Sequence, residues 1–180
     1  MHFRTATPDD VPALVKLYKA VAKVEGYIAR LEHEVTEEYV SGFVSKSLER
    51  GLIIVGEDES TPGELIAEIH GYTPGVTIFN HVFGDVTFLV HPDHQGKKIG
   101  RTIMSIFLDE IATSRPDIGK VELFTGESNR RAISLYQSFG FLIEGRMEMR
   151  YKNPVGTYEA DIPMGWVNPN FEFDGNIPRL

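Results

Sequence analysis

Two kinds of apolar spacing alternate along the chain. In four segments, at about 7–22, 36–49, 99–111 and 132–139, apolar residues recur every three or four positions, which predicts amphipathic helices. Shorter apolar runs bounded by turn residues predict strands at 3–6, 52–55, 65–72, 84–90, 121–124, 141–151 and 158–166. The predicted element order is therefore β-α-α-β-β-β-α-β-α-β-β.

This order predicts an α/β (α+β) protein with a mixed, mainly antiparallel central sheet of about seven strands and with helices on both faces. The turn-rich segment 58–63 joins two strands and predicts an antiparallel hairpin. The strand, helix and strand between 84 and 124 predict a parallel crossover of the usual right hand. A single domain over 1–166 accounts for these elements, and 167–180, rich in Asn and Pro, is expected to form a C-terminal extension.

Composition narrows the classes of function. The 180 residues contain no cysteine, which excludes disulfides, thiolate metal sites and a cysteine nucleophile. The formal net charge is −8, and so acidic a chain is a poor nucleic-acid binder, which needs a basic face. No apolar run reaches the roughly 18 residues of a membrane span, and residues 1–5 do not have the layout of a signal peptide. A cytoplasmic protein with no nucleic-acid and no membrane partner is therefore expected.

The most informative segment runs from the strand at 84–90 through a polar loop into the third helix. Residues 95–100 (QGKKIG), named here the phosphate loop, place backbone N–H groups at a helix N-terminus, where free donors and the helix dipole favour a phosphate. Lys97, Lys98 and Arg101 add positive charge. The two glycines lie four positions apart, which fits neither a P-loop nor the three-glycine dinucleotide fingerprint.

Two motifs resemble those of the GCN5-related N-acetyltransferase (GNAT) superfamily. The phosphate loop resembles the family's Gln/Arg-x-x-Gly-x-Gly/Ala motif at its first and last positions, Gln95 and Gly100, whereas Lys98 stands in place of the middle glycine. Residues 129–141 (NRRAISLYQSFGF) resemble the family's Asn-x-x-Ala-x-x-x-Tyr-x-x-x-Gly-Phe motif at every fixed position. The predicted order of elements from 3 to 166 also agrees with the family fold.

The resemblance implies an acetyl-CoA-dependent N-acetyltransferase that passes the acetyl group to a primary amine, with acetyl-CoA as cosubstrate and no metal. Because no cysteine is present to carry an acyl group, direct transfer in a ternary complex is expected rather than a ping-pong route. The contacts to acetyl-CoA that the resemblance implies are Leu89 and Val90 through their main chain, together with Gln95, Gly96, Lys97, Lys98, Ile99, Gly100, Arg101 and Asn129.

The resemblance assigns a general acid and leaves the general base open. Tyr136 in the second motif would protonate the departing thiolate, although it also lies on the apolar side of its helix, where a core role is the alternative. Asp85, on the strand before the phosphate loop, is the first candidate for the base, and Glu68 on the adjacent strand is the second. His70 and His81 are further candidates because histidine titrates near neutral pH.

The acceptor is left open between a small-molecule amine, such as a polyamine, an amino acid or an aminoglycoside, and the amine of a protein. The loop between the first two helices often borders the acceptor in this family, which makes Tyr27, Arg30, Glu32, Glu34 and Tyr39 candidate contacts. Dimers are frequent in the family, so a homodimer is one expectation.

Alternatives from other classes of function stay open. A non-catalytic acyl-CoA binding or sensing domain of the same fold would keep the phosphate loop and dispense with the acid and the base. A P-loop NTPase or kinase is disfavoured by the spacing of the two glycines. His91 and His94 are close in sequence, but Pro92 lies between them and no third ligand is evident, so no metal site is expected.

Overall fold

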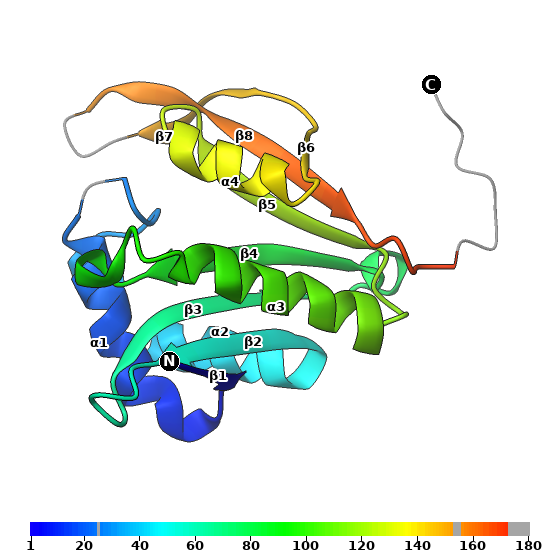
Figure 1. Cartoon of the computed structure of the whole chain (residues 1–180). Helices are drawn as coiled ribbons and strands as arrows, with labels where there is room; N and C mark the ends of the chain where they lie inside the picture. The colour runs from blue at the N-terminus through cyan, green and yellow to red at the C-terminus, as the bar shows by residue number, and fades with distance from the viewer. Residues whose placement is uncertain (25, 153–155, 173–180) are drawn as a thin grey trace.

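The computed structural model describes residues 1–24, 26–152 and 156–172, which form a mixed sheet flanked by helices (Figure 1). The strands lie in the order β1-β2-β3-β4-β5-β8-β6, and β7 also pairs with β8. Every pair is antiparallel except β4 with β5. The mixed, mainly antiparallel sheet predicted from the element order is confirmed. The strands are β1 (His2–Thr5), β2 (Gly51–Glu57), β3 (Leu65–Tyr72), β4 (Val82–Val90), β5 (Lys120–Gly126), β6 (Leu142–Ile143), β7 (Met147–Lys152) and β8 (Tyr158–Val167).

Helices cover both faces of this sheet, as predicted (Figure 1). They are α1 (Val11–Ala22), α2 (Glu37–Arg50), α3 (Ile99–Ser114) and α4 (Arg130–Ser138). The helices α1 and α2 pack on one face of β2 and β3, and α3 packs on the other face. The strand residues divide accordingly, because Ile53 and Val55 join the cluster of α1 and α2, whereas Ile54 joins the cluster of α3 and α4.

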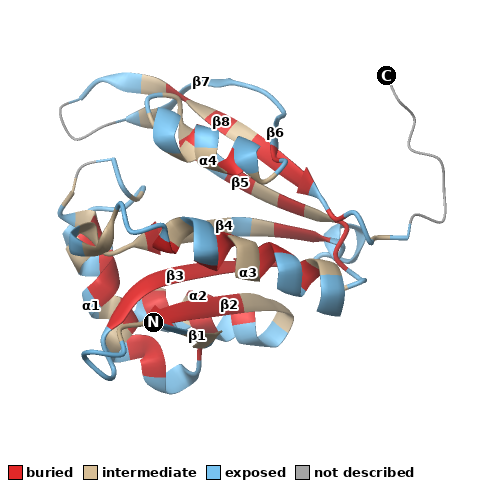
Figure 2. Cartoon of the chain, in the orientation of Figure 1, coloured by how far each residue is buried: buried red, intermediate tan, exposed pale blue. Residues whose placement is uncertain are grey.

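The strand β3 lies at the centre of both apolar clusters. Each of its residues is buried, so the strand is red along its length in Figure 2. Two of these residues, Glu68 and His70, are ionisable, and they share the face that α1 and α2 cover, since they alternate with Ala67 and Ile69 of the opposite cluster. Burial of ionisable groups costs free energy unless they are paired and hydrogen-bonded. The partners of Glu68 and His70 are described with the site.

The strands β4 and β5 are joined only at one end. They pair in parallel at Val82 and Phe83 with Lys120 and Val121, and α3 forms the crossover between them, as the sequence predicts. Beyond Phe83 the two strands diverge toward the phosphate loop (Figure 1). A bulge follows at once, because Asp85 has a positive φ of 50° and the register of β4 against β3 shifts in this region. The rest of β4 is therefore splayed from β5.

The last part of the sheet differs from the prediction in one respect. The single strand expected over 141–151 is two strands, β6 and β7, which pair with different parts of β8. The break falls at residues 144–146, where the N–H of Glu144 donates to the carbonyl oxygen of Pro163 at 2.9 Å. Met149 in β7 also has a positive φ of 56°, next to a register shift in its pairing with β8. The alternation of apolar residues continues across the break, which is why the sequence pattern does not reveal it.

The beginning of the expected C-terminal extension packs on the domain. Asn168 is buried, and its amide nitrogen donates to the carbonyl oxygen of Ile118 at 2.8 Å. Phe171 covers Gly119, where a Cβ would lie 2.9 Å from the Phe171 ring. Residues 173–180 of the expected extension lie outside the described part of the chain. Among the described helices, none combines the length and the hydropathy needed to cross a bilayer.

Candidate active site

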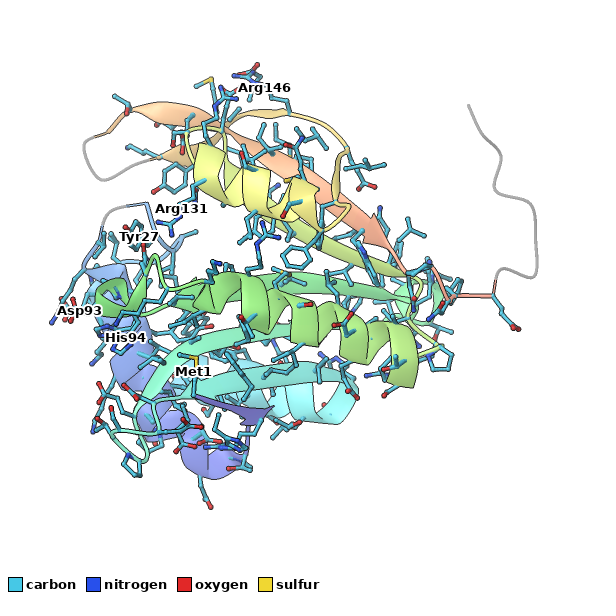
Figure 3. The ribbon with its side chains drawn as sticks, viewed as in Figure 1. Met1, Tyr27, Asp93, His94, Arg131 and Arg146 are labelled. Atoms are coloured by element: carbon cyan, nitrogen blue, oxygen red, sulfur yellow. The ribbon has the colours of Figure 1, made fainter. Side chains whose placement is uncertain are left out.

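A cavity of about 1260 Å³ occupies the space between the diverging strands β4 and β5. This volume exceeds the roughly 300–1,000 Å³ of an ordinary small-molecule site, which leaves room for two substrates. Tyr27 from the α1–α2 loop and Arg131 from α4, both labelled in Figure 3, belong to its wall. The wall is built from the segments 26–30, 85–90, 94–96, 98–101 and 124–126, with residues of α2, β3, α4, β7 and β8.

The phosphate loop makes a tight turn into α3. Gly96 has a φ of 77° and Lys98, the residue before the helix, has a φ of 65°. Left-handed φ values favour glycine, and in other residues they cost roughly 1–2 kcal/mol. Lys98 therefore adopts the backbone conformation that the replaced glycine would adopt most readily. Because α3 begins directly afterwards, the N–H groups of its first turn face the loop and are available to an anion.

Gly100, the last position of the phosphate loop motif, allows α3 to sit close to β4. A Cβ on this residue would lie 2.8 Å from Cζ of Phe88, which is closer than real side-chain contacts come. A larger residue would require either the Phe88 ring or the start of α3 to shift. The glycine therefore permits the close approach of the start of α3 to β4.

The positive charges around the phosphate loop are distributed unevenly. Lys98 and Arg101 line the cavity, whereas Lys97 is exposed and does not belong to the wall. The guanidinium of Arg101 donates to Oγ of Ser138 at 3.0 Å, which ties α3 to α4. Arg131 is a cavity residue that the sequence did not single out, and its Nη1 donates to Oε1 of Gln95 at 3.3 Å. It occupies a variable position of the second motif, so only the packing of α4 beside the loop brings it into the site.

The two main-chain contacts expected on β4 differ in direction. The N–H of His91 donates to the carbonyl oxygen of Ile66 in β3 at 2.8 Å. Because N–H groups alternate in direction along a strand, that of Leu89 also points to β3, and that of Val90 points to the side where β5 has diverged. Of the two residues, Val90 therefore presents its N–H to the cavity side, and Leu89 contributes to the cavity wall without doing so.

Tyr136 and Asn129, both from the second motif, lie in the cavity wall. Tyr136 is 7% exposed, and burial raises its pKa to about 12. Within the described residues its hydroxyl has no hydrogen-bond partner, so the phenol is protonated and free to donate at neutral pH. Asn129 caps α4, because its Oδ1 accepts from the N–H of Ala132 at 3.1 Å. Asn129 is therefore the N-cap of α4 as well as a residue of the cavity wall.

Aromatic and charged residues form the part of the wall contributed by the α1–α2 loop, α2 and β3. Of the candidate acceptor contacts, Tyr27, Arg30 and Tyr39 line the cavity, whereas Glu32 and Glu34 do not. Arg30 lies over the ring of Tyr39, with Cζ 3.9 Å from the ring centroid. No carboxylate forms an ion pair with Arg30 in the described part of the chain, which leaves its guanidinium available to an anionic group.

The carboxylate of Asp85 projects from the bulge in β4 into the same region. Asp85 is exposed and lines the cavity. Burial and the nearby carboxylate of Asp85 raise the pKa of Tyr72 to about 12, so this tyrosine is also neutral at physiological pH. Asp85 is therefore a cavity-facing anion beside neutral phenols, an arrangement that attracts a cationic amine.

Glu68, the second candidate base, has no access to the cavity. Its side chain is 0% exposed, and each of its carboxylate oxygens has a partner. The hydroxyl of Tyr18 donates to Oε2 at 2.7 Å, and Nδ1 of His70 lies 2.8 Å from Oε1. His70 does line the cavity, whereas His81 is exposed and lies outside the wall. Burial, with a contribution from Glu68, raises the pKa of Tyr18 well above its ordinary value, so Tyr18 stays a hydrogen-bond donor.

In the ranges 1–24, 26–152 and 156–172, no group of three or more His, Asp or Glu side chains is placed to hold a metal ion. The rings of His91 and His94 lie edge to face with centroids 5.7 Å apart. Nδ1 of His91 accepts from the N–H of Asp93 at 3.3 Å, which is a local turn contact.

Comparison with known proteins agrees with this geometry. Residues 14–141 match the model of the Acetyltransferase (GNAT) family. A curated relative, the L-amino acid N-acyltransferase MnaT of Escherichia coli (strain K12), is 25% identical over 154 residues, which cover 82% of this chain and 83% of the relative.

Solved structures share the fold. The structure of yncA, a putative acetyltransferase from Salmonella typhimurium with its cofactor acetyl-CoA, has a TM-score of 0.81, 20% identity and 99% coverage of both chains. The phosphinothricin acetyltransferase of Sinorhizobium meliloti in complex with acetyl-CoA has a TM-score of 0.81 and 17% identity, and covers 98% of this chain and 95% of that one. The family match spans well over half of the sequence and includes both motifs, so the chain belongs to the Acetyltransferase (GNAT) family and is an N-acetyltransferase.

Proposed function

We propose that the protein transfers the acetyl group of acetyl-CoA directly to the primary amine of a small molecule that also carries a carboxylate, as an amino acid does. The observation that carries this proposal is the composition of the cavity wall. The wall joins a phosphate loop, a neutral cavity-facing phenol and a group of charged and aromatic residues that a second substrate can reach.

Three features support acetyl-CoA as the cosubstrate. The phosphate loop offers the free N–H groups of the α3 N-terminus, and Lys98, Arg101 and Arg131 bring positive charge to it. On the cavity side of β4 the N–H of Val90 is directed away from β3, where it can bind an extended amide-bearing chain. Two of the solved structures with the same fold contain acetyl-CoA. The thioester of acetyl-CoA supplies the acyl group.

Tyr136 is proposed to assist the departing thiolate. Its hydroxyl is protonated at physiological pH, since burial raises the pKa to about 12, and no described residue accepts its proton. A thiolate is a better leaving group when a donor stabilises its developing charge. The absence of cysteine from the sequence supports direct transfer to the amine over an acyl-enzyme route.

The acceptor class follows from one cation and one anion of the wall, Arg30 of the α1–α2 loop and Asp85 of β4. Asp85 attracts the ammonium group, and Arg30, which has no carboxylate partner among the described residues, fits the carboxylate of the same molecule. The relative in Escherichia coli is named as an L-amino acid N-acyltransferase, which agrees with this choice. A polyamine or a protein amine would use Asp85 but would leave Arg30 without a partner.

The test is a thiol-release assay with acetyl-CoA and a panel of amines. The chain has no cysteine, so every thiol that appears comes from coenzyme A. The panel contains L-amino acids, their carboxamides, spermidine and a peptide with a free N-terminus. A charge-assisted hydrogen bond contributes about 1.5–3 kcal/mol, so the amino acid is expected to exceed its carboxamide by about 10- to 150-fold in kcat/KM.

A pair of variants tests the role of Arg30. If Arg30→Ala removes the preference for the amino acid and the control Lys23→Ala does not, Arg30 binds the carboxylate of the acceptor. Lys23 is a suitable control because it pairs with Glu32 and lies outside the cavity wall.

Two outcomes would contradict parts of this proposal. If spermidine or the peptide is the better acceptor, the acceptor class is wrong. If acetyl-CoA binds but no amine releases thiol, the protein is an acyl-CoA binding domain of the same fold.

A further inference from the structure

We propose that His70 is the general base of the acetyl transfer and that Glu68, held in turn by Tyr18, is the residue that positions it. The inference rests on the proposed function and adds a path by which the amine loses its proton. The sequence makes both residues candidates for the base. In this proposal only His70 takes the proton, and Glu68 acts through His70 and not on the substrate.

The hydrogen bonds of Glu68 select one tautomer of His70. Nδ1 of His70 lies 2.8 Å from Oε1 of Glu68, and the hydroxyl of Tyr18 donates to Oε2 at 2.7 Å. A carboxylate accepts and does not donate, so Nδ1 must carry the proton. Nε2 is then the nitrogen with the free lone pair. The carboxylate–histidine pair has the same logic as the acid that orients the histidine of a catalytic triad.

Stacking fixes the plane of the His70 ring. The ring lies against Phe43 of α2 with centroids 4.2 Å apart and an interplanar angle of 7°. On β3 the ring of Tyr72 is parallel to it within 1°, with centroids 6.0 Å apart. With its plane fixed by Phe43 and Tyr72 and its Nδ1 bound to Glu68, the ring has no freedom to turn away. Such preorganisation is what a general base requires.

Nε2 of His70 reaches the cavity although the residue is only 2% exposed. His70 lines the cavity, and the hydrogen bonds of its side chain in the described residues involve Nδ1. Ser47 Oγ is the buried side-chain polar atom of the described chain that lacks a partner. Nε2 has no hydrogen-bond partner among the described residues, yet it is not a fully buried atom, so it keeps some solvent contact. Because His70 lines the cavity, we infer that Nε2 makes this contact there. Glu68, at 0% exposure and outside the wall, has no such access.

Other titratable and charged groups surround the pair from each element packed against it. They are Tyr18 from α1, Arg30 from the α1–α2 loop, Tyr39 from α2, Tyr72 from β3 and Asp85 from β4. The pKa values of the three tyrosines are raised, with burial as the first cause, so these phenols stay neutral and do not compete for the proton. Asp85 is a carboxylate in the same cavity, and it is the rival base that the experiment must separate from His70.

The proton balance of the transfer needs such a group. A primary alkylammonium has a pKa near ~10.4, so its free amine at pH 7.5 is less stable by roughly 4 kcal/mol, which is the upper value for an amino acid because its α-ammonium is more acidic. Nε2 takes one proton from the ammonium, and the buried carboxylate of Glu68 stabilises the imidazolium that forms. The amine nitrogen then forms a bond to the thioester carbon, and the carbon–sulfur bond breaks. Tyr136 gives its proton to the departing thiolate and regains one as the nitrogen loses its second proton, and the proton on His70 leaves to solvent.

The experiment compares pH profiles of kcat/KM for full-length variants, with the best amine of the panel. His70→Asn keeps a donor near the position of Nδ1, facing Glu68, and removes Nε2. It is expected to lower kcat by about 10²- to 10⁴-fold and to abolish the acidic limb of the profile. Glu68→Gln keeps the shape of the carboxylate, and it is expected to lower kcat by about ten-fold or more and to move the acidic limb to lower pH. The limb moves because the charge that stabilises the protonated ring is gone.

Two controls make these results specific. His81→Gln removes an exposed histidine outside the cavity and should leave rate and profile unchanged. Equilibrium binding of acetyl-CoA to each variant reports folding and cosubstrate binding without turnover. Tyr18→Phe is a second test in the interior, because it removes the donor to Glu68 and should shift the acidic limb in the opposite direction to Glu68→Gln.

The outcomes distinguish the two proposals. If the wild type binds acetyl-CoA and acetylates no amine, the proposed function fails. If the wild type is active and His70→Asn binds acetyl-CoA with unchanged kcat and profile, the assignment of His70 is wrong. If the acidic limb disappears in Asp85→Asn and persists in His70→Asn, Asp85 is the base. Should His70→Asn fail to fold, an unshifted profile in both Glu68→Gln and Tyr18→Phe would equally overturn the proposal.

Discussion

Arg131 of α4 donates a hydrogen bond from Nη1 to Oε1 of Gln95 in the phosphate loop, at 3.3 Å. The two residues come from different motifs, Gln95 from the loop before α3 and Arg131 from α4, and both line the cavity. Their contact, together with the bond from Arg101 to Ser138, ties α4 to the phosphate loop and to α3. Both sides of the site therefore bring positive charge to the place where phosphate would bind.

We expect Arg131→Ala to raise the Kd for acetyl-CoA by about 3- to 10-fold, because one partly exposed charge near a phosphate contributes on the order of 1 kcal/mol. Titration calorimetry at two salt concentrations measures the change. The matched control is Arg130→Ala, since Arg130 carries the same charge at the next position and lies outside the cavity wall. An equal loss in both variants would mean that general charge, and not the position of Arg131, governs binding.

Replacement of Lys98 by glycine is expected to raise the stability of the fold and can weaken the binding of acetyl-CoA. Its φ of 65° suits glycine, so Lys98→Gly is expected to raise the free energy of unfolding by about 1 kcal/mol. For a chain of this size the melting temperature would rise by about 2–4 °C. If the lysine side chain also contacts phosphate, the same variant will bind acetyl-CoA more weakly.

Lys97→Gly is the control for this experiment, because a positive φ is recorded at Lys98 and not at Lys97. Glycine there adds freedom to the unfolded chain and should lower stability by about 0.4–1 kcal/mol. If Lys97→Gly and Lys98→Gly raise the melting temperature equally, the assignment of strain to Lys98 is wrong.

Tyr136→Phe is expected to lower kcat by about 10²-fold with little change in the Kd for acetyl-CoA. The phenylalanine keeps the aromatic ring, whose centroid lies 5.7 Å from that of Phe141, so only the hydroxyl is lost. Since the pKa of Tyr136 is about 12, activity should show no loss from its ionisation below about pH 11. A steady-state comparison from pH 6 to about 11 checks both statements. An unchanged kcat would leave Tyr136 with a packing role alone.

The pair of Arg4 and Asp10 predicts a pH dependence of stability. The guanidinium makes two hydrogen bonds to the Asp10 carboxylate, at 2.7 and 2.8 Å, and these are the first cause that holds the pKa of Asp10 below its ordinary value. A carboxyl whose pKa falls on folding stabilises the folded state above the unfolded pKa, near ~4, and loses that contribution as pH falls through the folded value.

Asp10→Asn should therefore lower the free energy of unfolding by about 1–3 kcal/mol at pH 7, and the difference from wild type should vanish toward pH 2. Urea unfolding at several pH values measures it. Asp9→Asn is the neighbouring control, because Asp9 is exposed. A constant difference between wild type and Asp10→Asn at all pH values would contradict the ion pair as its source.

The sequence predicts the features that depend on local chemistry. Helix starts follow from capping residues, as at Thr36, whose Oγ1 accepts from the N–H of Tyr39 at 3.1 Å. The mixed, mainly antiparallel sheet and its parallel crossover follow from the order of elements. The phosphate loop and the second motif lead to Gln95 and Tyr136, which the structure brings to one cavity.

Features that depend on tertiary packing could not be predicted in this way. Alternation along β3 puts Glu68 and His70 on one face, but only the cover of α1 and α2 decides that Glu68 is buried and that His70 reaches the cavity. Arg131 stands at a variable motif position, and its role depends on how α4 packs beside the loop. The division of 141–151 into β6 and β7 depends on which residues of β8 they pair with.

The divergence of β4 from β5 also bears on how the backbone exchanges its amide hydrogens. On the cavity side of β4, the N–H groups of Phe88 and Val90 have no strand partner in the described chain, because pairing with β5 ends at Phe83. The N–H groups of Thr87 and Leu89 point to β3 and are protected by it. Deuterium uptake should therefore alternate along this strand. A ligand that fills the cavity would slow exchange at Phe88 and Val90 first, which reports occupancy without any chemical turnover.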